Sequence, residues 1–314
     1  MSTTTAHKPN IKETADGLVR FNQIKPFTNV MFSGLFIILA LMTFLPVLFV
    51  MIISISSEAS VANNGYSFFP EELSLASYAY LWESRSYIGR AFLNSIGITV
   101  AGTLLGLVLT STLGYSLSRP NFYFKPLYTI MIIIPMLFSG GLVARYMVNT
   151  QVYHLKNTYW SMILPGACST FYVVIMRTFF QTTIPDSIIE SGKIDGASQL
   201  RIFVQLVLPI SLPVIATIGL FLTFNYWNAW YGAMLYVDSN HRTLYPLQYV
   251  LISIEKNASF MAMNEDHFME GAMSLPTETM RMAIVMVVVL PIACSYPFFQ
   301  RYFVGGLTVG AVKG

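Results

Sequence analysis

Charged side chains are scarce in this sequence. Only 11% of its 314 residues are charged, against about 25% in a typical soluble domain. Hydrophobic residues make up 54% of the chain. This balance excludes an ordinary soluble domain and indicates an integral membrane protein, with membrane lipid as a constant neighbour. The net charge of +3 is too small to indicate nucleic acid as a partner.

Motifs for catalysis and cofactor binding are also missing. No G-x-x-x-x-G-K-[ST] loop occurs, so the chain lacks the usual means of holding nucleotide phosphates. H-E-x-x-H, C-x-x-C and G-x-S-x-G are absent as well. The two cysteines, Cys168 and Cys294, fall in apolar stretches, which predicts small buried side chains rather than a disulfide framework. We therefore expect no enzymatic activity, no cofactor and no resident metal in this chain.

Histidine and methionine give only weak indications of a site. The four histidines are scattered through predicted tails and loops, where a solvated surface position is the default. Residues 261–273 form a Met-rich, acidic stretch. Such a stretch fits either a soft-metal site or an amphipathic contact surface, because methionine adapts to varied partners. We favour the contact surface.

Six apolar runs organise most of the chain. Each is long enough to cross about 30 Å of hydrocarbon, and together they cover approximately residues 30–54, 91–117, 126–146, 159–180, 209–237 and 278–299. We therefore predict an all-α membrane protein with six transmembrane helices. The flanks are an N-terminal tail over residues 1–29 and a C-terminal tail over residues 300–314. Glycines in the second run, including Gly102 and Gly106, predict a helix buried inside the bundle.

The distribution of basic residues predicts the orientation. Eleven Lys and Arg lie on the side of the termini, against seven on the other side. This excess places both termini in the cytoplasm. The runs contain no carboxylate at their centres, and the charges Arg145, Arg177, Glu278 and Arg281 all lie near predicted ends. Because proton or sodium coupling has no obvious carrier, the energy for any transport must come from another subunit.

Residues 185–208 interrupt the apolar pattern with a polar block. Five charges, including Asp186 and Glu190, would cost about 2.5–3.5 kcal/mol each at the bilayer centre. The block therefore lies outside the hydrocarbon. Pro185-Asp186 predicts a helix start, with the aspartate as a cap for free N–H groups. Asp195-Gly196 predicts a tight reversal into a second helix.

This block resembles the cytoplasmic EAA loop of ABC importer permeases. The family pattern is a Glu with two small residues, then Asp-Gly-Ala, a Phe, a Leu-Pro pair and a further Pro. The positions that match in register are Glu190, Asp195, Gly196, Ala197, Phe203, Leu208, Pro209 and Pro213. Ser191-Gly192 replaces the usual pair of alanines, and Gly192 adds flexibility to the predicted helix. Residues 114–125 and 300–314 are similar to segments of carbohydrate-importer permeases that act with a lipoprotein binding protein.

The resemblance implies a fold and a set of partners. The fold would be a type I ABC importer permease bundle in a bacterial plasma (inner) membrane, with the permease core over residues 91–299. The partners would be a second, non-identical permease, two ATPase subunits that bind ATP and Mg²⁺, and an extracytoplasmic sugar-binding protein. The cargo would be an oligosaccharide or polysaccharide fragment. The residues expected to couple the chain to the ATPase are Glu190, Ser191, Gly192, Asp195, Gly196, Ala197 and Phe203.

The fifth run has an unusual centre with two possible interpretations. Asn225 and Asn228 are three residues apart and would share a helix face, with Trp227, Trp230 and Tyr231 on an adjacent face. One interpretation is structural, with amides bonding between helices and aromatic rings forming an interfacial belt. The other is a translocation lining, in which amides meet sugar hydroxyls and indoles stack on sugar faces.

Two other functions remain open from the sequence. The first is an importer of the same kind whose cargo is a peptide, an amino acid or a metal. The second is a membrane-embedded enzyme acting on lipid-linked sugars. Such an enzyme needs a cluster of carboxylates or histidines at one membrane face, and the sequence shows none.

Overall fold

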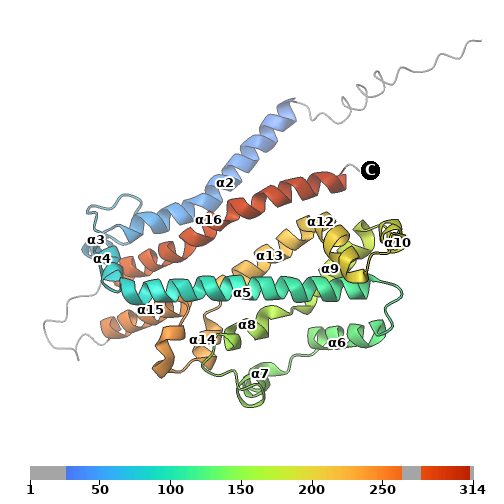
Figure 1. Ribbon diagram of the computed structural model, residues 1–314. Helices are drawn as coiled ribbons and strands as arrows, with labels where there is room; N and C mark the ends of the chain where they lie inside the picture. Colours follow the sequence, from blue (N-terminus) through green and yellow to red (C-terminus); the bar gives the residue numbers. More distant parts are fainter. Residues whose placement is uncertain (1–25, 264–276, 312–314) are drawn as a thin grey trace, which may run out of the picture.

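The structure is a computed structural model that describes residues 26–263 and 277–311 (Figure 1). In these ranges the chain forms helices, joined by loops that contain one isolated bridge between Ser56 and Leu73. The longest helix in the middle of the bundle is α5 (Arg85–Ser118). It packs against α8 (Trp160–Ala167), α9 (Thr170–Thr183), α13 (Leu212–Trp227) and α15 (Leu247–Met263). The bundle is therefore built around α5.

Glycines allow this central helix to approach its neighbours closely. Gly102 lies against the ring of Tyr226 on α13, and Gly114 lies against Met176 on α9. Both glycines are buried, as is Gly106. The prediction that the second run is a buried helix is confirmed. The main core includes Met176, Phe180, Ile218 and Leu222, all at most 1% exposed.

Three of the six predicted spans are broken in the structure. The third run divides into α6 (Lys125–Leu137) and α7 (Gly141–Met147), which continues as the π-helical turn η1 (Val148–Val152). The fourth run divides into α8 and α9, bent by 45°. The fifth run stops at Trp227 and resumes as α14 (Tyr231–Tyr236). The prediction of one continuous helix over residues 209–237 is therefore wrong.

The break after Trp227 has a local cause. Both the backbone N–H and the side-chain amide of Asn228 donate to the carbonyl of Phe224, at 3.1 and 3.0 Å. Asparagine competes in this way with regular helical hydrogen bonding, which is why it favours helix ends. Asn228 accordingly stands at the C-terminal cap of α13.

Helix length and apolar composition identify the helices that could cross a membrane. Within the described ranges, α2 (Pro26–Ser54) and α5 are long and apolar enough to cross a membrane. The number rises to four if α8 with α9, and residues 199–210 with α13, each count as one bent span. The final helix α16 (Thr277–Ala311) continues past the predicted end at Phe299. Most of the expected C-terminal tail is thus helical, and most of the Met-rich stretch 261–273 lies outside the described residues.

The cysteines differ from their prediction. Both Cys168 and Cys294 are free, as expected, but both are exposed on the chain rather than buried. Cys168 caps the C-terminal end of α8 at the bend before α9, where packing is interrupted. The prediction of small buried side chains was wrong because an apolar run does not tell which face of a helix meets neighbouring helices.

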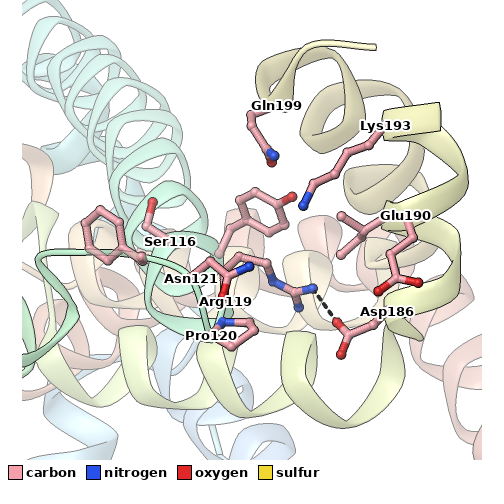
Figure 2. Close-up of a pocket in the computed structure, with 11 residues that line it drawn as sticks. Ser116, Arg119, Pro120, Asn121, Asp186, Glu190, Lys193 and Gln199 are labelled. Atoms are coloured by element: carbon pink, nitrogen blue, oxygen red, sulfur yellow. Dashed lines mark hydrogen bonds and ion pairs between the residues drawn. The ribbon is translucent and has the colours of Figure 1, made fainter. Parts of the chain in front are cut away.

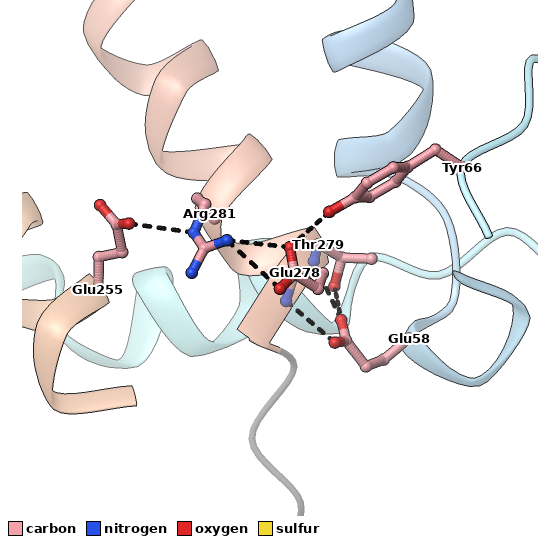
Figure 3. Close-up of polar contacts among 6 residues, drawn as sticks. All are labelled: Glu58, Tyr66, Glu255, Glu278, Thr279 and Arg281. Carbon is pink, nitrogen blue, oxygen red and sulfur yellow. Dashed lines mark hydrogen bonds and ion pairs between the residues drawn. The ribbon is translucent and has the colours of Figure 1, made fainter. Parts of the chain in front are cut away.

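A polar network joins the start of α16 to segments far away in the sequence (Figure 3). Glu58, at the start of α3 (Glu58–Asn64), accepts hydrogen bonds from the backbone N–H groups of Glu278 and Thr279 at 2.9 and 3.0 Å. It thereby caps α16 with a carboxylate, which also favours the positive end of the helix dipole. Arg281 pairs with Glu255 on α15 at 3.0 Å. Tyr66 donates to Glu278 at 2.6 Å, and this bond raises the pKa of Tyr66.

Two other short elements lie at the same end of the bundle as the start of α16. They are α4 (Ala76–Glu83) and the 3-10 turn η3 (Ser239–Leu244). Before η3, Asp238 accepts a hydrogen bond from Asn157 at 2.9 Å and pairs with Lys156 at 3.0 Å. These two partners lower the pKa of Asp238, with the Asn157 bond as the larger cause. The contacts join the loop before α8 to the loop after α14.

Candidate functional site

The polar block folds into a compact loop at the opposite end of α5 from α4. Its first helix is α10 (Asp186–Ile194), followed by α11 (Gln199–Ile202) and the π-helical turn η2 (Phe203–Val207). The short α12 (Leu208–Ile210) then leads into α13 through a sharp bend of 82°. The predicted pair of helices with a reversal between them is confirmed.

The reversal is made by the Asp-Gly pair. Asp195 ends α10, and Gly196 has φ +76, in the left-handed region where side chains are strained. The N–H of Ala197 then donates back to the carbonyl of Gly192 at 3.0 Å. Ser198 begins the next helix, because its side-chain oxygen accepts from the N–H of Arg201. The predicted role of Gly196 is confirmed by this backbone conformation.

Substituting Gly196 tests the turn. A β-branched residue at this φ is strained by about 1–2 kcal/mol, so Gly196→Val should raise amide exchange rates in α10 and α11 about tenfold. Gly196→Asn should leave exchange nearly unchanged, because asparagine tolerates the left-handed region. Hydrogen–deuterium exchange on the purified protein makes the comparison. Equal exchange in both variants would show that the turn does not depend on this φ.

The structure divides the predicted coupling residues into two groups. Glu190, Ser191, Asp195 and Gly196 are exposed. Gly192 is buried, and a Cβ at its position would lie 3.1 Å from Cγ1 of Ile202. The missing side chain of Gly192 allows α10 to pack on α11 and η2, a contact inside the chain that the sequence did not predict.

Ala197 and Phe203 also pack inward. Ala197 is half-buried against the core, and the buried Phe203 ring lies 4.9 Å from the ring of Tyr115 on α5. These residues hold the loop against the bundle rather than facing outward. Two exposed apolar side chains were missed by the sequence analysis: Ile194 is 86% exposed and Leu200 is 71% exposed. Large apolar residues inside a polar block were the signal that could have found them.

Arg119 ties this loop to the rest of the chain (Figure 2). Its Nη1 pairs with Asp186 at 3.0 Å, and its Nη2 donates to the carbonyl of Phe180 at 3.2 Å. Its Nε donates to the hydroxyl of Ser118 at 2.9 Å. The Arg119 side chain is only 15% exposed, whereas the Asp186 side chain is 71% exposed, so the ion pair meets water on the side of Asp186. Asp186 therefore pairs with Arg119, and no side chain caps α10.

A cavity of about 420 Å³ lies between the end of α5 and α10. Arg119, Asn121, Glu190, Lys193 and Gln199 are among its lining residues (Figure 2). Lys193 and Gln199 extend into it from α10 and the start of α11. The hydroxyl of Tyr115, which also lines it, is buried without a hydrogen-bond partner. At this end of the bundle, charged, amide and apolar side chains thus surround the cavity.

The residues proposed to line a pathway are only partly brought together. Asn225 and Tyr231 line a second cavity, of about 290 Å³, beside the break between α13 and α14. Trp227 instead points into the bundle, where its indole N–H donates to the carbonyl of Val288 at 3.3 Å. Asn228 accepts from Gln248 at 3.1 Å, and Trp230 packs edge-on against Tyr231. Asn228 is the C-terminal cap of α13, so Trp230 and Tyr231 lie beyond the helix that carries Asn225.

Neither region has the composition of a metal centre. In the described part of the chain, no three His, Cys, Asp or Glu side chains are grouped so that they could hold a metal ion. The Glu58–Glu278 network is engaged in helix capping and ion pairs.

Residues 102–309 match the family described as binding-protein-dependent transport system inner membrane component. The chain belongs to that family, and its apolar helices fit a multi-pass protein of the plasma membrane.

Comparison with individual proteins shows which transport permeases this chain is similar to. Protein LplC of Bacillus subtilis (strain 168) is 36% identical over 87% of this chain and 90% of that protein. The polygalacturonan/rhamnogalacturonan transport system permease protein YtcP of the same organism is 35% identical over 91% of this chain and 98% of that protein. A solved bacterial ABC transporter involved in the import of the acidic polysaccharide alginate has a chain with the same fold. It covers 95% of this chain at 24% identity, with a TM-score of 0.70.

Proposed function

We propose that this chain is a permease subunit of an ATP-driven importer that translocates an oligosaccharide or polysaccharide fragment. Family membership makes the chain a transport component, and relatives such as YtcP are named for polysaccharide transport. The observation that carries the proposal is the anchored loop over residues 185–208. Its outer side is exposed, and Arg119 fixes its inner side to α5 and α9.

The loop acts as the coupling element to an ATPase. The chain has no nucleotide-binding loop, so ATP and Mg²⁺ belong to two partner ATPase subunits. Glu190, Ile194 and Leu200 form an exposed charged and apolar surface suited to a protein partner. The cavity beside Lys193 receives side chains of that partner. Closure of the ATPase dimer moves α10, and the Arg119–Asp186 pair passes the motion to α5.

The remaining assembly follows from this role. The bundle spans the membrane six times with both termini in the cytoplasm, which puts residues 185–208 on the ATPase side. Residues 30–299 form the permease domain, and residues 91–299 its core. A second, non-identical permease completes the pathway. Residues 55–90 and 238–277 would lie on the extracytoplasmic side and include the contact surface for a sugar-binding protein, although residues 264–276 of the second segment are outside the described ranges.

Reconstitution tests the function. The complex of this chain with its co-purifying permease, ATPase and binding protein is placed in proteoliposomes and given labelled oligosaccharides, a peptide and an amino acid. We expect ATP-dependent uptake of at least one oligosaccharide and none of the other two solutes. Uptake of the peptide or the amino acid alone would show an importer of another cargo. Uptake that persists without ATP would contradict the coupling mechanism.

A further inference from the structure

The cavity beside the break between α13 and α14 contains a single charged side chain. Its lining comes from α7, α8, α13 and α14, and includes Asn225, Tyr226, Tyr231 and Arg145. No carboxylate is among the lining residues. The lining thus carries one positive charge and no negative charge among mostly apolar groups.

Arg145 has no partner in the described part of the chain. Three cations of the described residues pair with carboxylates, namely Arg119 with Asp186, Lys156 with Asp238, and Arg281 with Glu255 and Glu278. The guanidinium of Arg145 makes no hydrogen bond or ion pair with any described residue. This guanidinium is therefore available to a ligand that enters the cavity.

The neighbours of Arg145 are suited to a sugar. The side-chain nitrogen of Asn225 donates to the hydroxyl of Tyr172 at 3.0 Å, and its side-chain oxygen accepts nothing from the described residues. Tyr231 is 42% exposed beside the indole of Trp230. Amide and phenol groups bond sugar hydroxyls, and an exposed aromatic ring offers an apolar face. At about 290 Å³ the cavity lies at the small end of ligand sites, which suits one sugar unit.

We propose that Arg145 makes this cavity a subsite for a sugar unit that carries a carboxylate, that is, a uronic acid. The proposal rests on the proposed function as a carbohydrate permease. The planar guanidinium binds a carboxylate through two parallel hydrogen bonds, which a neutral sugar cannot accept in the same way. Because Arg145 is exposed, water weakens the bond enough for the cargo to leave again.

Paired substrates provide the test. The reconstituted complex is given a galacturonate trisaccharide and the same trisaccharide as its methyl ester, which keeps the hydroxyls and removes the charge. Arg145→Gln should lower uptake of the acid about tenfold, the size of a lost charge-assisted hydrogen bond, and leave uptake of the ester within about twofold. Arg145→Lys should keep part of the preference, because the charge remains while the fork geometry is lost.

Several controls separate the possible outcomes. Arg177→Gln removes an arginine of α9 that does not line the cavity, and it should leave the ratio of acid to ester uptake unchanged. The binding protein and lipids are the same throughout, so only the permease differs between wild type and variant. An equal fall for acid and ester would overturn the proposal and indicate that Arg145 binds a lipid phosphate or the second permease. Unchanged acid uptake in Arg145→Gln would overturn it too. If the wild type transports neither trisaccharide but does transport a neutral one, the proposal of a uronic acid subsite is overturned. The proposed function as a carbohydrate permease is then still supported.

Discussion

Glu190→Lys is expected to abolish ATP-driven uptake while the protein still inserts and assembles its bundle. Glu190 is exposed on α10, and its carboxylate makes no hydrogen bond or ion pair with any described residue of its own chain. The fold therefore does not depend on it, whereas a docked ATPase would meet a reversed charge. Misplaced charge at an interface costs several kcal/mol, which corresponds to a fall in uptake on the order of a hundredfold or more.

The matched control places a lysine nearby without touching the loop. Thr182→Lys adds a positive charge near the end of α9, where Thr182 is exposed and its hydroxyl bonds only within its own helix. It should retain most of the uptake. Substrate-stimulated ATP hydrolysis and co-purification of the ATPase should fall together with uptake in Glu190→Lys. Normal uptake in Glu190→Lys would remove α10 from the coupling mechanism.

Gly102→Ala is expected to destabilise the bundle, although alanine is the better helix former. A Cβ at Gly102 would lie 2.5 Å from Cζ of Tyr226. The ring cannot move aside easily, because it is 5% exposed and its hydroxyl donates to the carbonyl of Ile163 at 2.7 Å. Overpacking of this kind costs about 1–3 kcal/mol. Thermal unfolding of the detergent-solubilised protein should shift to lower temperature by several degrees, on the order expected for that loss.

Gly97→Ala supplies the opposite expectation on the same helix. A Cβ at Gly97 meets nothing within 4 Å, so only the change in helix propensity acts. That change favours alanine by up to about 1 kcal/mol. The unfolding temperature of Gly97→Ala should equal or exceed that of the wild type. The same unfolding temperature for Gly97→Ala and Gly102→Ala would mean that Tyr226 is not held where the structure places it.

The sequence predicted the parts of the fold that depend on composition and local pattern. The apolar runs led to the helices, the glycines of the second run led to the centre of the bundle, and Asp195-Gly196 led to the turn. Hydrophobic periodicity could not reveal the breaks, since residues 228–230 are no less apolar or aromatic than their surroundings. The break depends instead on a competition for the carbonyl of Phe224, which is a matter of geometry.

The sequence predicted the position of the loop but not which of its side chains point into the bundle. Matching residues identified the loop, yet a match does not tell which side chains point inward, and Gly192 and Phe203 proved to be internal contacts. The spacing within α10 indicates its inner face, because Ile189 and Gly192 are three residues apart and both are buried. The pairing of Arg119 with Asp186 joins positions too distant in the sequence for any local rule to connect.

The first helix in the described part of the chain, α2, has its main neighbour in the last one, α16. Most of α2 is exposed, and it packs mainly on α16, while Glu58 just after it caps the start of that same helix (Figures 1 and 3). During synthesis, α2 can therefore complete its packing against α16 only after all the intervening helices have been made. The bundle around α5 can form before this closing step.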